Sequence, residues 1–465
     1  MRESKSNRDS RPRSGRRSRR KKYKVNKIRL FTSLLIMVLV LWGSVKVVSG
    51  AVGFVTTALG GNRVQKQLEE ISIDEESTET KTEKTESLPD EKSEEKTTSV
   101  STEQKKDQTE EKTNPPAPAE SKTATILATG DILYHFGMID AGYNAQADSY
   151  DFRSHYDKVR EMVAGADLAL ANFEGTMAQD LYPLAAYPLF NAPNAVATAL
   201  ADAGFDALCT ANNHCLDSGT DGIAATIDAI EANGMGYFGT KKTPGNSLLV
   251  KDVNGIKIGL LAYSSYFNGL EENLSEEEGY VISPMDMETI ESDIKNAKAE
   301  GCDLVVVYAH WGVEYEFAPT EDQRNMAHNM IEWGCDIVLG SHPHVLQETE
   351  IVEKNGRDRF IIYSMGNGIS NQREETIGNK YTETGVLLRF TVRKTDDETI
   401  LEQVEMYPTW VNSFLDEQGS RRFELLNTQD FVEGGSLRDT VPEHTLNRII
   451  DARTYGLQIL KGEFN

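Results

Sequence analysis

The sequence predicts an α/β fold in which a buried sheet carries polar side chains along one edge. Three observations lead to this prediction. A local pattern of helix, glycine, aspartate and short apolar run occurs four times. Each apolar run ends in residues that can bind a metal, and a fifth apolar run opens the same region. Helices that alternate with short apolar strands are typical of a sheet covered by helices.

The four copies share the same internal order. In each copy the glycine can end the preceding helix, and four or five apolar residues after the aspartate are long enough for a buried strand. The copies are VAGADLALANFEG at 163–175, DAGFDALCTANNH at 202–214, AEGCDLVVVYAHWG at 299–312 and EWGCDIVLGSHPH at 332–344. The opening strand is TATILATGD at 123–131.

Ligands of such sheets bind at the carboxyl ends of the strands. Polar residues at the end of one strand are common, but repetition at five strand ends favours a functional site over chance placement. The side chains that we expect at this edge are Asp131, Glu174, Asn213, His214, His310, His342 and His344.

The stretch GSHPHV at 340–345 follows the last of these strands. Alternate side chains of an extended chain point the same way, and Pro343 favours an extended conformation at His342. We therefore expect His342 and His344 to project together and to bind a metal. For this stretch taken alone, a turn with two incidental polar residues is the alternative.

The expected ligand set is larger than one tetrahedral zinc requires. A mixture of imidazole, carboxylate and amide oxygen suits Mn, Fe or Zn, and one or two divalent ions can be accommodated. Glu174 could bridge two ions, which together clamp a phosphate. His214 directly follows the ligand candidate Asn213 and is free to act as a general acid. The metal ligands predicted in this way are Asp131, Glu174, Asn213, His310, His342 and His344.

The N-terminal region predicts a membrane anchor. Residues 1–29 hold fourteen Lys or Arg and two acidic residues, and residues 30–60 are mostly apolar with Lys46 as the interruption. About 20 apolar residues span a bilayer, and positive flanks stay in the cytoplasm. We expect a basic cytoplasmic tail, a single transmembrane signal anchor at 30–60 and an extracellular C-terminal domain at the cell membrane. A cleaved signal peptide is the alternative.

Residues 61–122 are rich in Glu, Lys, Thr and Ser and predict a disordered low-complexity stalk. The folded domain is then expected at 123–465. The formal net charge of −24 argues against nucleic acid as a partner. Four cysteines are few for an extracellular domain, and no disulfide framework is expected.

The motifs ATGD, NFEG, ANNHCLDSG, YAHWGVEY, GSHPHV and YSMGNGIS occur in this order between residues 123 and 385. They resemble the bacterial CapA family, also called PgsA, of poly-γ-glutamate capsule synthesis proteins in the calcineurin-like metallophosphoesterase superfamily. The resemblance implies a four-layer α/β/β/α sandwich, a metal-dependent hydrolase type of site, and membrane anchoring. Capsule synthase membrane subunits and an acidic polymer or phosphoester substrate are the implied partners.

By position, the resemblance implies that Asp131 is the first metal ligand, that Glu174 replaces a bridging aspartate, and that Asn213 and His214 are a ligand and the catalytic histidine. It implies metal roles for His310, His342 and His344 as well. The chain departs from the superfamily's Asp-x-His motif, because Ile132 and Leu133 follow Asp131. One ion therefore loses an imidazole. His135, four residues after Asp131, is a possible substitute.

Three further residues are candidates for substrate binding. Asn172 precedes Glu174 by two residues but could cap a strand. Glu314 and Glu316 follow the HWG motif, and for Glu316 a solvated loop is the alternative. Asn367 could orient a ligand, although Gly-Asn-Gly is also ordinary turn sequence.

The region after residue 385 predicts strands at GVLLRFTVRK and EQVEMYPTWV and a helix from Pro442 to Lys461, all closing the same domain. Two functions remain open on the sequence: a metal-dependent hydrolase, or a non-enzymatic scaffold that binds a nascent envelope polymer or its synthase.

Overall fold

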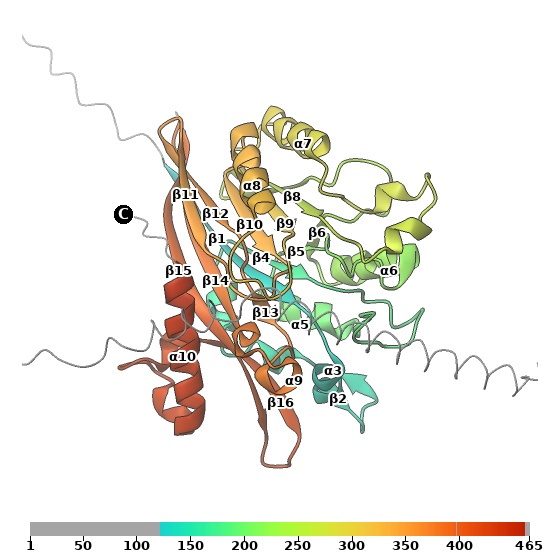
Figure 1. Cartoon of the computed structure of the whole chain (residues 1–465), viewed down its shortest axis with the longest axis vertical. Coiled ribbons are helices and arrows are strands. Elements are labelled where there is room, and N and C mark those ends of the chain that lie inside the picture. The colour runs from blue at the N-terminus through green and yellow to red at the C-terminus, as the bar shows by residue number, and fades with distance from the viewer. Residues whose placement is uncertain (1–120, 397, 461–465) are drawn as a thin grey trace, which may run out of the picture. The chain divides into compact units, whose positions relative to one another are not determined.

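The computed structural model describes residues 121–396 and 398–460. Two β-sheets pack face to face, and helices cover both outer faces (Figure 1). The predicted tail, the predicted anchor and almost all of the predicted stalk lie outside the described residues. Among the helices of the described part, none combines the length and the apolar character that a bilayer span requires.

The larger sheet is mixed, with parallel strands on one side of its centre and antiparallel strands on the other. Its spatial order is β16 (Arg421–Asn427), β15 (Thr399–Leu415), β14 (Thr384–Lys394), β1 (Lys122–Ile132), β4 (Leu168–Phe173), β5 (Ala207–Cys209) and β6 (Gly236–Phe238), with β13 (Asn367–Ile369) also paired to β1. β1 begins one residue before the predicted start of the domain. Because β1, β4 and β5 are parallel, their carboxyl ends meet at one edge.

The second sheet repeats this arrangement. Its order is β11 (Thr349–Lys354), β12 (Arg357–Ile362), β10 (Ile337–Ser341), β9 (Leu304–His310), β8 (Ile256–Ser264) and β7 (Leu249–Val253). β8, β9, β10 and β12 are parallel, and β7 and β11 are antiparallel edge strands. The hairpin of β11 and β12 was not identified from the sequence.

The central strands of both sheets are buried on both faces. In β1, Ile126 and Ala128 face the second sheet, and Leu127 faces the helices on the other side. In β9, Val306 belongs to the core between the sheets, and Val307 belongs to the core under the outer helices. Strands with two buried faces read as continuous apolar runs, which explains why the sequence pattern was so clear.

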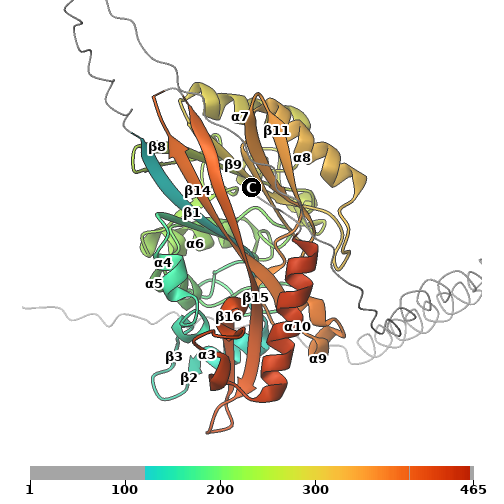
Figure 2. The same ribbon diagram turned by 90° about the vertical axis from the view of Figure 1, so that its left-hand side faces the viewer.

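The helices complete the four layers. α4 (Arg160–Ala164) and α5 (Ala195–Ala203) cover the larger sheet, while α7 (Met287–Ala299) and α8 (Glu321–Trp333) cover the second sheet (Figures 1 and 2). α8 begins with a capping box at Thr320 and ends at Gly334, whose φ of 116° suits glycine. The predicted four-layer α/β/β/α sandwich is confirmed.

The aspartate of each repeat has a structural role. It lies just before one strand and accepts a hydrogen bond from a backbone N–H at the start of the neighbouring strand. The four bonds are Thr125 N to Asp167 at 2.8 Å, Ala169 N to Asp206 at 2.7 Å, Lys257 N to Asp303 at 2.8 Å and Val305 N to Asp336 at 2.8 Å. Each carboxylate thus satisfies a donor beyond the end of the regular strand pairing, and the repeat links neighbouring strands in register.

The remaining helices lie around these layers: α3 (Phe136–Gly142), α6 (Gly219–Ala232), α9 (Glu374–Ile377) and α10 (Glu443–Ile459). α10 packs on β15, where Ile449 and Ala452 contact the Trp410 cluster (Figure 2). The strands and the helix predicted for the C-terminal region are confirmed, and they close the same domain.

Candidate metal centre

Asp131 is held in a fixed orientation at the end of β1. The strand pairing shifts register between Thr129 and Asp131. A Cβ on the intervening Gly130 would lie 1.9 Å from the carbonyl oxygen of Gly366, so only glycine fits there. The fully buried Asp131 carboxylate accepts hydrogen bonds from Asn172 Nδ2 at 2.7 Å and from the backbone N–H of His342 at 3.1 Å. Its oxygens therefore point towards the second sheet.

Glu174 carries the strongest sign of a missing cation. Its side chain follows β4 and is buried, and neither carboxylate oxygen has a hydrogen-bond partner among the described residues. Burial raises the pKa of Glu174 well above its ordinary value, with His344 opposing and Asp131 adding to the shift. A buried carboxylate without a donor is costly, and a bound cation would satisfy it.

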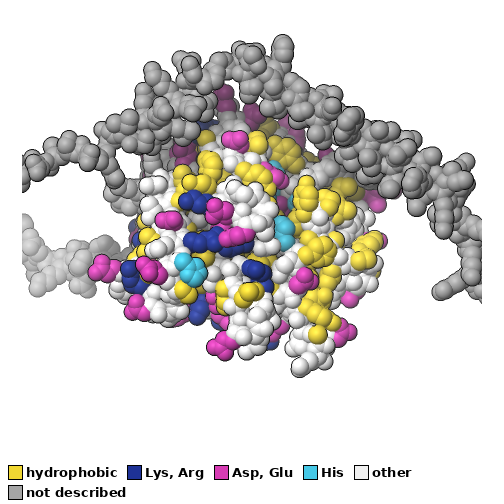
Figure 3. Space-filling model, turned by 60° about the horizontal axis from the view of Figure 1, so that its bottom comes forward, with side chains coloured by type: hydrophobic (Ala, Val, Ile, Leu, Met, Phe, Trp, Pro, Cys, Tyr) yellow, Lys and Arg dark blue, Asp and Glu magenta, His cyan; other side chains and the backbone are white. Residues whose placement is uncertain are grey.

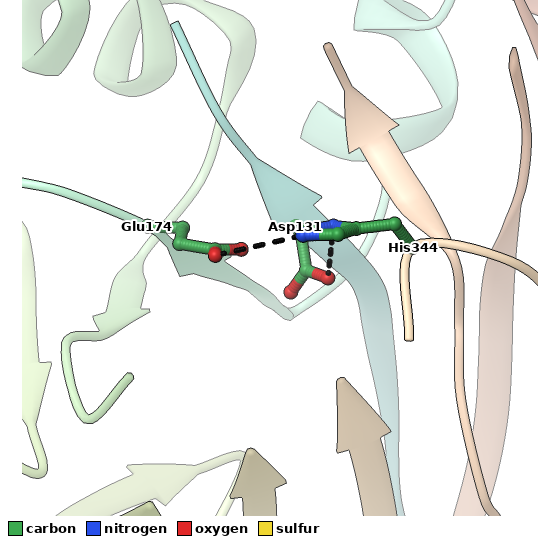
Figure 4. A group of neighbouring side chains, drawn as sticks. All are labelled: Asp131, Glu174 and His344. Atoms are coloured by element: carbon green, nitrogen blue, oxygen red, sulfur yellow. Dashed lines mark ion pairs between the residues drawn. The ribbon is translucent and has the colours of Figure 1, made fainter. Parts of the chain in front are cut away.

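Two histidines approach the same oxygen of Glu174. His344 Nε2 lies 3.8 Å from Glu174 Oε1, and His310 Nε2 lies 3.9 Å from it. Ligand atoms bonded to one first-row ion at about 2.0–2.2 Å lie about 3–4 Å apart. Figure 4 shows Glu174 and His344 extending towards each other beside Asp131, which is 3.3 Å from His344 Nδ1. These three residues form a buried group that could hold a metal ion.

Further possible ligand atoms lie around His310, beside the same Glu174 oxygen. Asn213 Oδ1 is 2.9 Å from His310 Nε2, and the other ring nitrogen of His310 is 2.9 Å from Ser341 Oγ. The His342 ring lies 4.8 Å from the His310 ring, and its buried Nδ1 has no partner among the described residues. Asn213, His310 and His342 thus lie next to Glu174, whereas Asp131, Glu174 and His344 are the His, Cys, Asp or Glu side chains of the described residues whose ligand atoms all lie within 4.8 Å of one another.

The conformation expected for GSHPHV is wrong. β10 ends at Ser341, and His342 and His344 have φ values of 94° and 59°, in the left-handed region rather than in an extended strand. The reason is long-range: the His342 N–H turns to bond Asp131, 211 residues away. Left-handed non-glycine residues cost about 1–3 kcal/mol each. The two rings nevertheless lie together, 6.1 Å apart.

Burial and neighbouring charges shift the pKa values of the three histidines in different directions. Burial alone would lower the pKa of His344, but the Glu174 and Asp131 carboxylates outweigh it and raise the pKa to about 9. Burial and the nearby positive His344 lower the pKa of His342 to about 3. Burial also lowers the pKa of His310 well below its ordinary value.

The departure after Asp131 has a clear structural consequence. Leu133 stands two residues after Asp131, and its buried side chain packs with Ala186 and Phe190 in a small apolar cluster. His135 lies near the centre, where the charges of His344 and His214 act on it; its ring is 5.1 Å from Phe190, and its Nδ1 has no partner among the described residues. Burial lowers the pKa of His135 to about 4. His135 does not belong to the buried Asp–Glu–His group.

His214 faces the centre from the loop after β5 and is fixed by an acidic partner. Its Nδ1 lies 2.7 Å from Asp217 Oδ2, and its ring meets the Phe190 ring edge-on at 4.7 Å. Asp217 also accepts a hydrogen bond from the Phe190 backbone at 2.5 Å, and burial raises the pKa of Asp217. Asp217 was not identified from the sequence, although its position three residues after His214 was the available signal.

The other candidates support the ligands. Asn172 orients Asp131, and Asn212, which the sequence analysis missed, donates hydrogen bonds to Asn172 at 3.3 Å and to the Phe173 carbonyl at 2.7 Å. Asn367 lies 3.0 Å from His344 Nδ1. Glu314 is exposed, and it is close enough to raise the pKa values of Glu174 and His344.

The structure thus brings together the side chains expected at the sheet edge: Asp131, Asn172, Glu174, Asn213, His310, His342, His344 and Asn367, with His214 beside them and Glu314 at the rim. The residues present suit a divalent ion, because imidazole, carboxylate and amide oxygens converge around an unpaired buried carboxylate.

Comparison with known proteins identifies relatives of this chain. Residues 125–372 match the family described as "Bacterial capsule synthesis protein PGA_cap". The chain is 31% identical over 259 residues to "Capsule biosynthesis protein CapA" of Bacillus anthracis, covering 54% of this chain and 60% of that protein. It is also 31% identical over 198 residues to "PGA biosynthesis protein CapA" of Bacillus subtilis, covering 42% of this chain and 49% of that protein. The matches thus span about half the length of these relatives.

Among solved structures, the chain resembles the calcineurin-like phosphoesterase YfkN from Bacillus subtilis at 16% identity, covering 73% of this chain and 99% of that chain with a TM-score of 0.36. The family match extends over more than half of the present sequence. This chain belongs to the family of bacterial capsule synthesis proteins that the motifs of its sequence indicated.

Proposed function

We propose that this protein takes part in the assembly of an extracellular capsule polymer and that its metal centre hydrolyses a phosphate ester. The family relationship supports the capsule role, with poly-γ-glutamate as the first polymer to test. The observation that carries the metal-dependent activity is the buried Glu174 carboxylate. It has no hydrogen-bond partner among the described residues, and His310 and His344 approach one of its oxygens.

The ligands divide into two groups that share Glu174. Glu174, Asn213, His310 and His342 would hold one ion, and Asp131, Glu174 and His344 would hold a second. Mn, Fe and Zn suit these residue types. When bound, such ions supply positive charge that polarises a phosphoryl group and lowers the pKa of a bound water.

The protein's own residues then orient the substrate and move a proton. Hydrolysis forms a bond from the water oxygen to phosphorus and breaks the bond from phosphorus to the leaving oxygen. His214 delivers a proton to that oxygen and is regenerated by the proton lost from the water. Asp217, 2.7 Å from His214 Nδ1, fixes the ring so that Nε2 is the atom that donates.

The experiment that tests this activity compares two adjacent variants on aryl phosphate mono- and diesters. His214→Ala should keep its metal and lose about 10²- to 10⁴-fold in kcat. Asn213→Ala should lose metal affinity and activity together. Normal capsule output from His214→Ala, with no esterase activity in the wild type, would instead favour the scaffold that binds a polymer or its synthase.

The location is also part of the proposal. The basic tail and apolar segment at 1–60 support a single-pass anchor at the cell membrane, with the folded domain outside and capsule synthase membrane subunits as neighbours. Protease added to intact cells should cut within 61–122 and release a stable fragment that begins near Lys122. A domain that survives until the membrane is permeabilised would contradict this topology.

A further inference from the structure

Exposed apolar side chains gather around the metal centre. The Tyr266 ring is 44% exposed and lies 5.3 Å from the His342 ring. Leu189 is 45% exposed and directly precedes Phe190, whose ring contacts His214. Figure 3 shows one face of the molecule, on which hydrophobic side chains lie among Lys, Arg, Asp, Glu and His side chains. An apolar patch of this kind usually marks a binding surface.

Exposed side chains also lie near His344. Tyr187 is 79% exposed, and its phenol is close enough to contribute to the raised pKa of Tyr315. The Tyr315 ring in turn lies 6.2 Å from the His344 ring. Phe136, which follows His135, and Val313, which follows the His310 strand by three residues, are also about half exposed. We call Phe136, Tyr187, Leu189, Tyr266 and Val313 the apolar rim.

The loops that carry and flank this rim contain no Lys or Arg. This holds for residues 176–191, 265–286, 311–320 and 342–348, and the second of these segments alone contains five glutamates and one aspartate. The charges that shift the pKa values of Glu174 and His344 belong to carboxylates and imidazoles. The carboxylates of these loops would therefore repel an extended polyanion.

We propose that the ligand of the metal centre is an amphipathic phosphate ester, with one phosphate head at the ions and an uncharged apolar body against the rim. This inference rests on the proposed phosphoester function and names its substrate class. Under this proposal the polyanionic capsule polymer does not bind at the metal centre. The apolar body gains affinity from the surface that it removes from water.

The test measures binding of three probes to the full chain loaded with Mn²⁺, by calorimetry in one fixed detergent solution. Methyl phosphate reports on the ions alone, decyl phosphate adds an apolar body, and oligo-γ-glutamate represents the polymer. The variants Tyr187→Ser and Leu189→Ser reduce the rim. Leu415→Ser is the matched control, because Leu415 is 60% exposed at the hairpin between β15 and β16, away from the centre.

Decyl phosphate should bind the wild type at least about 10-fold more tightly than methyl phosphate, and only when metal is bound. Each rim variant should weaken decyl phosphate about 3- to 10-fold and leave methyl phosphate unchanged, whereas Leu415→Ser should change neither. Oligo-γ-glutamate should not displace either phosphate.

Equal affinity for the two phosphates, or a decyl preference that survives in both rim variants or without metal, would overturn the amphipathic substrate while leaving the phosphoester function in place. A rim substitution that alters only the oligomeric state would assign the rim to a second copy of the chain and would equally overturn it. If neither phosphate shows metal-dependent binding, the proposed function itself fails.

Discussion

The two halves of the metal centre differ in the number of their ligands, although similar strands carry both. Glu174 serves both. In the proposed centre Asn213, His310 and His342 would join Glu174 on one ion (the complete half), and Asp131 and His344 would join it on the other (the reduced half). Leu133, which stands where the superfamily motif has a histidine, packs in a small apolar cluster with Phe190.

The same fold can therefore carry sites with different numbers of ligands. The reduced half is also held in a defined geometry. Gly130 leaves room for the Gly366 carbonyl, and hydrogen bonds from Asn172 and from the His342 N–H orient Asp131. We therefore expect the complete half to bind its ion tightly and the reduced half to bind a second ion weakly.

The largest effect is expected from His310→Ala. This substitution removes a buried ligand of the complete half and leaves Asn213 Oδ1 without its partner. The tightly bound ion should be lost, with an affinity decrease of more than about 100-fold, because outer partners alone account for 10- to 100-fold. Metal analysis after dialysis against a weak chelator measures it. An unchanged tight ion would place that ion in the other half.

His344→Ala should have a smaller effect on tight binding. It removes an imidazole from the reduced half, so the first ion should stay bound within about 10-fold while the weak second ion disappears. Titration with Mn²⁺, followed by its paramagnetic relaxation of water, separates the two events. Loss of the tight ion from His344→Ala, to the extent seen for His310→Ala, would show that the halves act as one unit.

Leu133→His should strengthen metal binding in the reduced half. A histidine at this position restores the missing imidazole, and the second ion should then bind about 10- to 100-fold more tightly. Leu133→Met is the control, since it keeps an apolar side chain of similar volume. A stoichiometry that stays the same in a folded Leu133→His protein would mean that the Phe190 cluster, and not the missing ligand, limits the reduced half.

The smallest effect is expected from Asn367→Ala. Asn367 contacts His344 Nδ1 at 3.0 Å and donates to the Thr382 carbonyl at 2.9 Å, so it positions a ligand without being one. The second ion should weaken about 10-fold, and the first ion should be unaffected. If both ions weaken equally, Asn367 acts on the stability of the whole edge, which thermal unfolding would reveal.

Much of the architecture could be predicted because its signals are local. The repeated glycine, aspartate and apolar run marked the strands β4, β5, β9 and β10, and the strand ends placed the ligand candidates at one edge. The roles of the four repeat aspartates could not be read, because each bonds a strand far away in sequence, as Asp167 does with Thr125.

The parts of the site that escaped prediction depend on distant contacts. The left-handed turn at His342 exists because Asp131 lies opposite it, a fact that no local pattern contains. Asn212 donates a hydrogen bond to Asn172 from another strand end, and Leu133 packs against Phe190. Neither contact is visible in the local sequence. Asp217 was the exception, because its spacing from His214 was visible in the sequence.

The central claim is that Glu174 is a shared ligand whose charge requires a cation. The most direct test is thermal unfolding of the wild type and of Glu174→Gln, each with a strong chelator and with saturating Mn²⁺. In chelator, Glu174→Gln should be the more stable protein by about 1–3 kcal/mol, because the substitution removes a buried carboxylate that has no donor.

In Mn²⁺ the order should reverse, because metal at about 100 times its Kd stabilises the wild type by about 2.7 kcal/mol and the variant has lost the shared ligand. Reversal of the stability order between chelator and metal is the result that this account predicts. A wild type that is more stable than Glu174→Gln in chelator and gains nothing from metal would contradict it.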